Sequence, residues 1–322
     1  MAYTNIRINL LAKKYGYPKW MIERYAEILG PELEEFLEAC ERPLPKSIRV
    51  NTLKIDIKTA LRDLEAKGFI LEPVKWCSEG FWVKNSPMSI GATREYLLGY
   101  YFIQTSASML PPLLLDPSPE HIILDMCAAP GGKTSHIAQL LKNQGAVISI
   151  EIDEQRAIAL KNNLARCGVF NTLILNMDAK EFPKLNFKVD KILLDAPCSG
   201  EGLIRQKPER KISRSIKDII FCSNNQEKLA EAAVNSLKDG GTLIYSTCSL
   251  APEENEEVID YLINNFPMRV EKISVDGEPG LTQFKDRVYD NSLANARRIY
   301  PHKHESIGFF ICKLVKEGVK CA

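Results

Sequence analysis

The sequence has no long apolar run. None of its hydrophobic stretches approaches the roughly 20 residues that a membrane-spanning helix needs. The segment 1–15 mixes Arg7, Asn9, Lys13 and Lys14 with apolar residues, so it lacks the apolar core of a signal peptide. These two absences predict a cytoplasmic protein that does not bind a membrane.

Disulfide and metal motifs are missing as well. The chain has nine cysteines, an odd number, and no C-x-x-C pair, which excludes a paired disulfide framework and a zinc ribbon. It has only four histidines, and the close pair His302 and His304 stands too isolated to indicate a metal ligand set. The sequence therefore predicts no metal site.

A net charge of either sign is also lacking. The formal charge is +1, from 42 basic and 41 acidic residues. Any affinity for nucleic acid must then come from a local basic face, because the field of the whole molecule is weak. The composition alone does not indicate RNA, and its length of 322 residues allows a catalytic domain of about 200 residues with a smaller unit beside it.

The most informative stretch is Ile122–Thr134, which reads I-I-L-D-M-C-A-A-P-G-G-K-T. An apolar strand stops at Asp125, a turn of small residues follows, and a helix-type sequence begins at Lys133. Such a turn offers free backbone N–H groups to a polar or anionic ligand. A phosphate-binding P-loop is excluded because Cys127 stands where that motif needs glycine, and G-x-G-x-x-G is absent. On this turn alone, ligand binding and an ordinary strand–helix turn are equally good interpretations.

Two later stretches favour ligand binding. Residues 191–202 read K-I-L-L-D-A-P-C-S-G-E-G, and residues 241–250 read G-T-L-I-Y-S-T-C-S-L. Each is a strand of the buried type that ends in small polar residues and one cysteine. Ligands of open parallel sheets bind beyond the carboxyl ends of the strands. We therefore expect Cys198 and Cys248 to lie near the ligand of the first turn.

The pattern divides the chain into three parts. Residues 1–45 have helical spacing, with Gly16-Tyr17-Pro18 and Gly30-Pro31 separating the helices. Residues 46–98 read as a small α+β module, and residues 99–322 alternate strand and helix, which predicts a doubly wound parallel sheet. The module is expected to contain strands 47–55, 69–76 and 80–83 and a helix 58–67. The third part is expected to contain strands 122–124, 147–151, 172–176, 189–194, 241–245, 269–275 and 307–314 and helices 153–167 and 224–237.

The motifs C-A-A-P-G-G-K-T, D-A-P-C-S-G and S-T-C-S, in this order, resemble those of the Fmu/Sun/Nop family of RNA cytosine-C5 methyltransferases, and within it the archaeal tRNA enzymes. The segments R-V-N-T-L-K and Y-F-I-Q-T-S-A-S-M-L extend the resemblance over nearly the whole chain. It implies S-adenosylmethionine as cofactor and a Rossmann-like methyltransferase sheet that a small α+β RNA-recognition-like module precedes. The module lacks the R-G-F-x-F type of signature, so base stacking on its sheet is not expected.

The cofactor contacts follow from strand ends and from the resemblance. Glu151 ends the second strand, where a carboxylate accepts hydrogen bonds from the ribose hydroxyls. Asp178 follows the third strand and is expected at the adenine, while Arg156 matches a cofactor position of the family. Asp153 is interpreted as a helix N-cap instead. The methionine end is expected on the turn, whose residues are Cys127, Ala128, Ala129, Pro130, Gly131, Gly132 and Lys133, with Asp195 beside it.

The reaction requires an activated cysteine. A thiolate that adds to C6 of cytosine turns C5 into a nucleophile for the sulfonium methyl group, after which the C5 proton and the thiolate must leave. The residues alone do not say whether Cys198 or Cys248 attacks. By resemblance, Cys248 is the nucleophile, Cys198 assists product release, and Asp195 binds the pyrimidine edge. Lys133 is expected to neutralise developing charge. Small buried residues are the interpretation for Cys40, Cys77, Cys167, Cys222, Cys312 and Cys321.

The expected substrate is structured RNA, because the target base must leave its stack to reach such a pocket. We expect tRNA rather than rRNA, since relatives that act on rRNA often carry an extra N-terminal helical domain and this sequence has room only for a short one. A protein side chain or a small molecule as substrate would leave two cysteines without a task, and a non-catalytic RNA-binding protein would not need them. We expect the protein to act as a monomer. Two basic groups are candidates for phosphate contact, with solvated surface as the alternative for each. They are Arg205, Lys207, Arg210, Lys211 and Arg214, and Arg297, Arg298, His302, Lys303 and His304.

Overall fold

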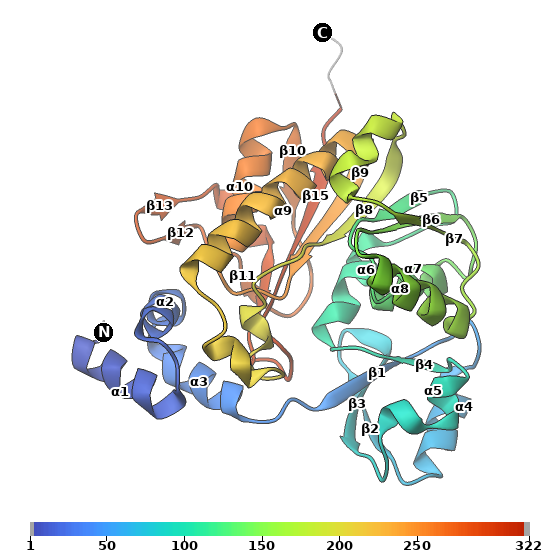
Figure 1. Cartoon of the computed structure of the whole chain (residues 1–322), viewed down its shortest axis with the longest axis horizontal. Helices are drawn as coiled ribbons and strands as arrows, with labels where there is room; N and C mark the ends of the chain where they lie inside the picture. The colour runs from blue at the N-terminus through green and yellow to red at the C-terminus, as the bar shows by residue number, and fades with distance from the viewer. Residues whose placement is uncertain (1–2, 319–322) are drawn as a thin grey trace.

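The computed structural model describes residues 3–318, and its first elements are three short helices. They are α1 (Asn5–Tyr15), α2 (Lys19–Leu29) and α3 (Leu33–Glu41). The apolar stripe of α2 is buried, with Met21, Ile22 and Tyr25 at most 1% exposed. These side chains share one cluster with Ile204 and Leu250 of the large domain. The helices therefore pack against the loops that follow the central strands, beside the sheet in Figure 1.

The small module is a four-stranded antiparallel sheet in the order β2-β3-β1-β4. Its elements are β1 (Lys46–Val50), α4 (Ile57–Glu65), β2 (Ile70–Val74), β3 (Cys77–Asn85), α5 (Arg94–Leu97) and β4 (Tyr101–Ile103). Strand β4 lies beyond residue 98, so the sheet of this module crosses the predicted boundary. Strand β1 ends at residue 50 and not at 55, because Asn51 opens a turn in which its carbonyl accepts a hydrogen bond from Lys54 N–H at 3.0 Å.

The segment that follows β1 ties the module to the large domain. The Asn51 amide donates hydrogen bonds to the carbonyls of Gly99 and Cys167, each at 2.8 Å. The Lys54 ammonium donates to the Arg166 carbonyl at 2.7 Å, at the carboxyl end of a helix of the large domain. Burial of such polar groups is tolerated only when they are paired. The contacts explain why the module packs directly on the large domain, below the sheet in Figure 1.

The large domain is built on a nine-stranded mixed sheet. Strands β7, β6, β5, β8 and β9 are parallel and adjacent in this order, and β15 pairs antiparallel with β9. The predicted parallel sheet is thus present from β7 to β9, and beyond β9 the strands β15, β14, β11 and β10 pair antiparallel. The strands are β5 (Ile122–Asp125), β6 (Ala146–Glu151), β7 (Thr172–Asn176), β8 (Val189–Asp195), β9 (Leu237–Thr247), β10 (Met268–Glu271), β11 (Glu278–Pro279), β14 (Arg297–Ile299) and β15 (Phe309–Lys316), and β12 (Gln283–Phe284) and β13 (Arg287–Val288) form a separate hairpin.

Both faces of the central strands are buried under helices. In β8, Ile192 and Leu194 point into the cluster under α9 and α10, whereas Leu193 points into the cluster under α6 and α7. This alternation follows from the two-residue period of a strand, and it explains why the strands are almost continuously apolar. The helices are α6 (Leu110–Leu115), α7 (Gly132–Leu140), α8 (Glu154–Cys167), α9 (Ile216–Ser236) and α10 (Glu256–Asn265). Helix α9 starts earlier than predicted, at a capping box formed by Ser215 and Asp218.

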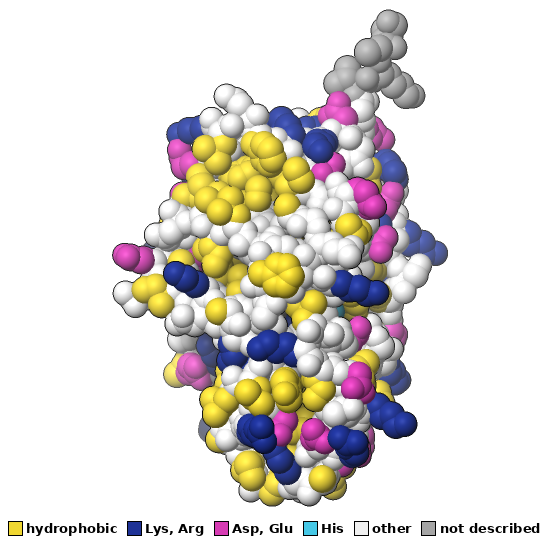
Figure 2. Space-filling view, turned by 90° about the vertical axis from the view of Figure 1, so that its right-hand side faces the viewer, with side chains coloured by type: hydrophobic (Ala, Val, Ile, Leu, Met, Phe, Trp, Pro, Cys, Tyr) yellow, Lys and Arg dark blue, Asp and Glu magenta, His cyan; other side chains and the backbone are white. Residues whose placement is uncertain are grey.

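The β7 edge of the sheet keeps apolar side chains in solvent. Leu173 on β7 is 58% exposed, and Phe170 just before it is 80% exposed. Figure 2 views the molecule from this side and shows apolar side chains gathered above the small module. Within residues 3–318, no helix is long and apolar enough to cross a membrane.

Candidate active site

The turn after β5 is shaped by glycine. Gly131 caps α7 with a φ of +100°, a conformation that other residues rarely adopt. A Cβ at Gly132 would lie 3.2 Å from Phe102 Cε1 of the small module, so the module leaves no room for a side chain there. Asp125, at the end of β5, accepts a hydrogen bond from the Thr134 hydroxyl at 2.7 Å. The turn is thus held at both its strand end and its helix end.

Glu151 lies directly behind this turn, at the end of β6. Its side chain is nearly buried and accepts hydrogen bonds from the N–H groups of Ala129, at 3.3 Å, and Asp153, at 3.1 Å. The Arg156 guanidinium donates to the Ala129 carbonyl at 2.9 Å and pairs with Glu151 at 3.5 Å. Asp153 caps α8, as predicted, by accepting from the Arg156 N–H group.

Asp178 lies across a small cavity from Glu151. It caps the short helix Ala179–Leu185 by accepting from the Lys180 N–H group at 3.0 Å, and the Lys180 ammonium lies 3.3 Å from it. The cavity, about 110 Å³, is lined by Cys127, Glu151, Arg156 and Asp178 together with Met126, Ile152, Ala179, Lys180, Pro197, Asn225 and Leu229. Sequence reasoning missed Lys180 and Asn225, which hydrogen-bond to each other at 3.1 Å.

Asp195 stands at the end of β8 and joins two strand ends. Its carboxylate pairs with the Lys133 ammonium at 2.6 Å and accepts from the Ser246 hydroxyl of β9 at 2.7 Å. Lys133 belongs to the first turn of α7. The predicted neighbours Lys133 and Asp195 are therefore in direct contact, and their ion pair is partly exposed to solvent.

A wider cavity opens on the other side of this ion pair. It has a volume of about 440 Å³ and lies between the first turn, the segment after β4 and the loop after β8. Its polar lining includes Gln104, Lys133, Asp195, Gln206 and Lys207, and its apolar lining includes Phe102, Ala129, Pro130 and Leu203. A flat aromatic ring with a polar edge matches such a lining. Part of the wall comes from β4 of the small module and from the segment after it.

Cys198 and Cys248 meet at the carboxyl ends of β8 and β9. Their Sγ atoms lie 3.0 Å apart, and both side chains are partly exposed. The adjacent Cys248 thiol and burial together hold the pKa of Cys198 well above its usual range. The thiol of Cys198 is then protonated at neutral pH and can donate to Cys248. The prediction that two loops far apart in the chain bring these cysteines to one rim is confirmed.

Glu254 holds the two loops that carry Cys198 and Cys248. It is fully buried in the turn before α10 and accepts hydrogen bonds from the Ser199 N–H group, at 2.7 Å, and from the Ser199 hydroxyl, at 2.5 Å. It also accepts from the Ser249 hydroxyl and from the Gln226 amide. Ser199 and Ser249 directly follow the two cysteines. The only signal in the sequence is the run P-E-E-N-E after S-T-C-S, and acidic runs usually lie on the surface.

Most of the predicted phosphate-binding residues have partners within the protein, and two of the arginines are buried. Arg205 is 8% exposed and donates to the carbonyls of Arg42 and Pro43. Arg298 is 1% exposed and pairs with Glu256. The prediction was wrong for both, because a guanidinium that is buried and bonded to other parts of the chain is not available to a phosphate. The exposed Lys207 lies instead at the rim of the wider cavity.

The other cysteines behave as predicted where they are described. Cys40, Cys77, Cys167 and Cys312 are buried, and Cys222 is half-buried on α9. Cys321 lies outside the described residues.

Comparison with known proteins decides the family. A model described as 16S rRNA methyltransferase RsmB/F matches residues 112–315, and a model of the N-terminal domain of 16S rRNA methyltransferase RsmF matches residues 17–106. The chain belongs to the RsmB/F methyltransferase family. The resemblance to Fmu/Sun/Nop enzymes that the motifs indicated is thereby confirmed.

Individual members of the RsmB/F family match nearly the whole chain. The human 28S rRNA (cytosine(4447)-C(5))-methyltransferase is 42% identical over 95% of the chain, which spans only 38% of that relative. The Pyrococcus abyssi tRNA (cytosine(49)-C(5))-methyltransferase is 39% identical over 92% of the chain and 96% of its own length. NSun6 from Pyrococcus horikoshii, solved with SFG, superposes with a TM-score of 0.85 at 28% identity, over 94% of this chain and 98% of that one.

The methyl donor of this family is S-adenosylmethionine, and SFG is an analogue of it. The residues present fit this group. Glu151 and Asp178 present carboxylates to one cavity, and Asp125 Oδ1 is buried without a hydrogen-bond partner beside the turn. Burial of the Asp125 carboxyl raises its pKa to about 6.

Proposed function

We propose that this protein methylates C5 of cytosine in structured RNA, through a bond between Cys248 and C6 of the base. The observation that carries the proposal is the pair of thiols 3.0 Å apart at the ends of β8 and β9. The Lys133–Asp195 ion pair, which lines the wider cavity, lies at the end of β8 and is hydrogen-bonded to Ser246 of β9. One cavity suits a nucleoside-bearing cofactor, and the other suits an extruded base. The names of the two curated relatives support the same reaction class.

S-adenosylmethionine supplies the methyl group from a sulfonium. Within the chain, the Glu151 carboxylate would accept hydrogen bonds from the ribose hydroxyls, and the Asp178 carboxylate would accept one from the adenine. Arg156 holds Glu151 and the Ala129 carbonyl in place, so its role is to shape the turn. The backbone of residues 127–133 would hold the methionine end, and Asp195 would bind the base beside the methyl donor.

The cysteines divide the chemistry between them. The Cys248 thiolate adds to C6, and the Lys133 ammonium neutralises the negative charge that moves onto the ring. The Asp195 carboxylate accepts hydrogen bonds from the pyrimidine edge. After C5 has gained the methyl group, its proton must leave, and the bond between Cys248 and C6 must break. Once Cys248 is a thioether, it no longer raises the pKa of Cys198, so the Cys198 thiol loses its proton to solvent more easily. The resulting thiolate takes the C5 proton, and the electron pair of the C5–H bond expels the Cys248 thiolate from C6.

The two roles are separated by single substitutions. Cys248→Ala should abolish turnover, whereas Cys198→Ala should form an RNA–protein adduct that survives SDS, because the methylated base is not released. Cys222→Ala, a half-buried cysteine on α9, is the matched control and should keep normal activity. An active Cys248→Ala enzyme, or a Cys198→Ala enzyme with normal turnover and no adduct, would contradict the assignment.

The preferred substrate is tRNA. The Pyrococcus abyssi relative, which is 39% identical over 92% of the chain, is named as a tRNA enzyme. The test is methyl transfer from labelled S-adenosylmethionine to an unmodified tRNA pool and to rRNA fragments, followed by nucleoside mass analysis. 5-Methylcytidine in tRNA supports the proposal. Label in rRNA alone would favour the second candidate, an rRNA cytosine-C5 methyltransferase, and label in neither RNA would reject both.

A further inference from the structure

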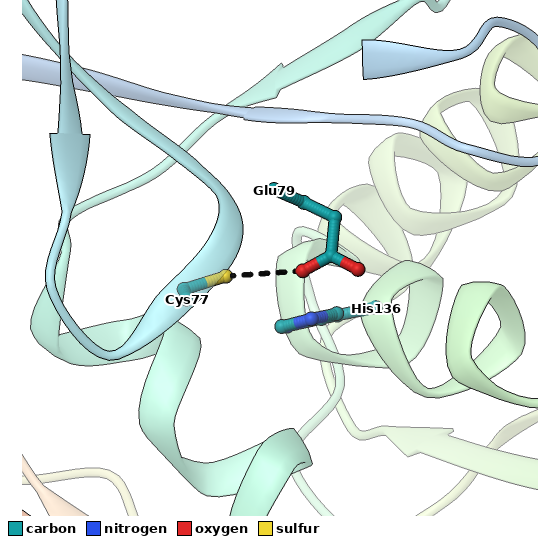
Figure 3. Close-up of side chains that lie close together, drawn as sticks. All are labelled: Cys77, Glu79 and His136. Carbon is teal, nitrogen blue, oxygen red and sulfur yellow. Dashed lines mark hydrogen bonds between the residues drawn. The ribbon is translucent and has the colours of Figure 1, made fainter.

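A second cluster of reactive side chains lies away from the catalytic cysteines, where the small module meets α7. Cys77 and Glu79 come from β3, two residues apart, so their side chains point to the same side of the strand. His136 comes from α7 in the large domain. The Cys77 sulfur, a carboxylate oxygen of Glu79 and a ring nitrogen of His136 lie within 4.8 Å of one another. Figure 3 shows the three side chains facing one another across the domain junction.

His136 gives this cluster its significance. Its side chain is completely buried, and neither ring nitrogen has a hydrogen-bond partner. Buried imidazoles nearly always find a partner, because an unpaired polar group in the interior is costly. Burial also holds the pKa of His136 well below its usual range, so the ring is neutral. A neutral imidazole is the form that coordinates a metal.

We propose that Cys77, Glu79 and His136 bind one zinc ion that joins the small module to the large domain. A thiolate, an imidazole and a carboxylate together are a donor set for zinc, whereas magnesium and calcium prefer oxygen ligands alone. In Figure 3 the carboxylate and the thiol lie on the same side of the imidazole ring. The lone pairs of the ring nitrogens lie in the plane of the ring, so coordination requires a turn of His136 about χ2, which is a broad torsion in histidine.

The charges around the cluster set the conditions for binding. Burial raises the pKa of the Cys77 thiol to about 11, so an incoming ion must displace its proton. The resulting thiolate and the Glu79 carboxylate neutralise a divalent ion. The buried Arg49 guanidinium, which hydrogen-bonds to Ser135 on α7, lies near enough to affect the pKa of both Cys77 and His136.

The sequence predicted no metal site, because the ligands come from two domains and form no local motif. The catalytic thiols are the main competitor in a test, since Cys198 and Cys248 also form a close pair. The experiment therefore uses the full chain with Cys198→Ala and Cys248→Ala. This protein is stripped with a chelator, dialysed against Zn²⁺ or Co²⁺ and freed of excess ion, and its metal content and visible absorption are measured.

We expect about one ion per chain and, with Co²⁺, the absorption band of a cobalt–thiolate bond. His136→Ala and Cys77→Ser should each lose most of the bound ion, and the second should lose the thiolate band. Glu79→Gln, on a partly exposed side chain, tests the site without disturbing the core and should weaken Zn²⁺ affinity roughly tenfold or more. Cys167→Ser, a buried thiol outside the cluster, is the control and should bind normally.

Three outcomes would overturn the proposal. The first is that the parent protein binds no ion. The second is that Glu79→Gln and Cys77→Ser bind as much ion as the parent protein. The third is that Cys167→Ser loses as much bound ion as Cys77→Ser. None of these results depends on methyl transfer, so failure of the metal site and failure of the proposed reaction are distinguishable.

Discussion

At the scale of single residues, the site depends on carboxylates that position other groups. Glu254 touches neither cavity, yet it holds Ser199 and Ser249, which follow the two cysteines. Burial raises its pKa, while the hydrogen bonds from Ser199 oppose that shift. A carboxylate that accepts from so many donors cannot be replaced by an amide, whose NH₂ group would face other donors.

Glu254→Gln should therefore reduce kcat by about a hundredfold or more, because a displacement of about 1 Å at the reacting cysteines is enough for such a loss. The KM for S-adenosylmethionine should stay within about twofold, since the carboxylate does not line the cofactor cavity. Steady-state kinetics and the rate of thiol alkylation at Cys248 check this. Glu253→Gln, on the neighbour that pairs with Arg24, is the control. An unchanged kcat in Glu254→Gln would remove the positioning role.

Asp178 is a residue with two possible tasks, because it caps a short helix and faces the proposed adenine site. Asp178→Ala removes both tasks, whereas Asp178→Asn keeps an N-cap oxygen. We expect both variants to bind S-adenosylhomocysteine about tenfold to a hundredfold more weakly, through loss of a hydrogen bond to a charged group. Calorimetric titration gives the dissociation constants. If Asp178→Asn binds normally and Asp178→Ala does not, the residue acts through the helix cap alone.

At the scale of elements, the end of β1 and the turn after it attach the module to the large domain. Arg49 reaches α7, and Asn51 and Lys54 reach the carboxyl end of α8. These three residues, which are close together in the sequence, thereby connect the module to the two helices that flank the cofactor turn. The module forms part of the wall of the site, because Phe102 of β4 packs closely against Gly132 of the cofactor turn.

Asn51→Ala should cost about 2–4 kcal/mol in the free energy of unfolding, because two hydrogen bonds vanish and two buried carbonyls lose their donor. Urea titration followed by circular dichroism measures this. Thr52→Ala, at the exposed next position, should stay within about 0.5 kcal/mol of the parent. A comparable loss in both variants would show that the segment, and not the amide, is responsible.

At the scale of the whole molecule, the N-terminal helices pack against the loops at the carboxyl ends of the central strands. Arg24 of α2 pairs with Glu253, and beside this pair Glu201 is buried with one carboxylate oxygen unpartnered. Burial raises the pKa of Glu201 to about 8, far above its ordinary value of 4.5. A group whose pKa is raised on folding stabilises the fold below its unfolded pKa, and this contribution is lost as the pH rises through the folded value.

Between pH 5 and 8.5 the protein should therefore lose about 4 kcal/mol that Glu201→Gln does not lose, because the amide stays neutral at every pH. Urea titrations of both proteins at the two pH values check the difference. Glu209→Gln, on an exposed side chain, should follow the parent protein. Parallel pH profiles for the parent and Glu201→Gln would mean that the carboxylate is not protonated in the folded state. The expected monomeric state and cytoplasmic location stay predictions.

The order of strands and helices could be read from the chain wherever the signal was local. The N-cap at Asp153, the third strand at 172–176 and the glycine-rich turn before Lys133 all depend on neighbouring residues. The antiparallel strands β11 and β14 could not be read, because they are two and three residues long and depend on pairing with β15 and with each other. Strand β4 was missed in the same way, since its three residues gain their partner only from β1.

The sequence by itself determined the family, the cofactor turn and the pair of cysteines, because these motifs are contiguous and the carboxyl ends of parallel strands must meet on one rim. Only the tertiary structure decided which charges are free. It buried Arg205 and Arg298 against other chain segments, brought Glu254 under both cysteine loops, and set His136 beside Cys77. Burial and pairing between distant residues depend on packing, and no local pattern encodes them.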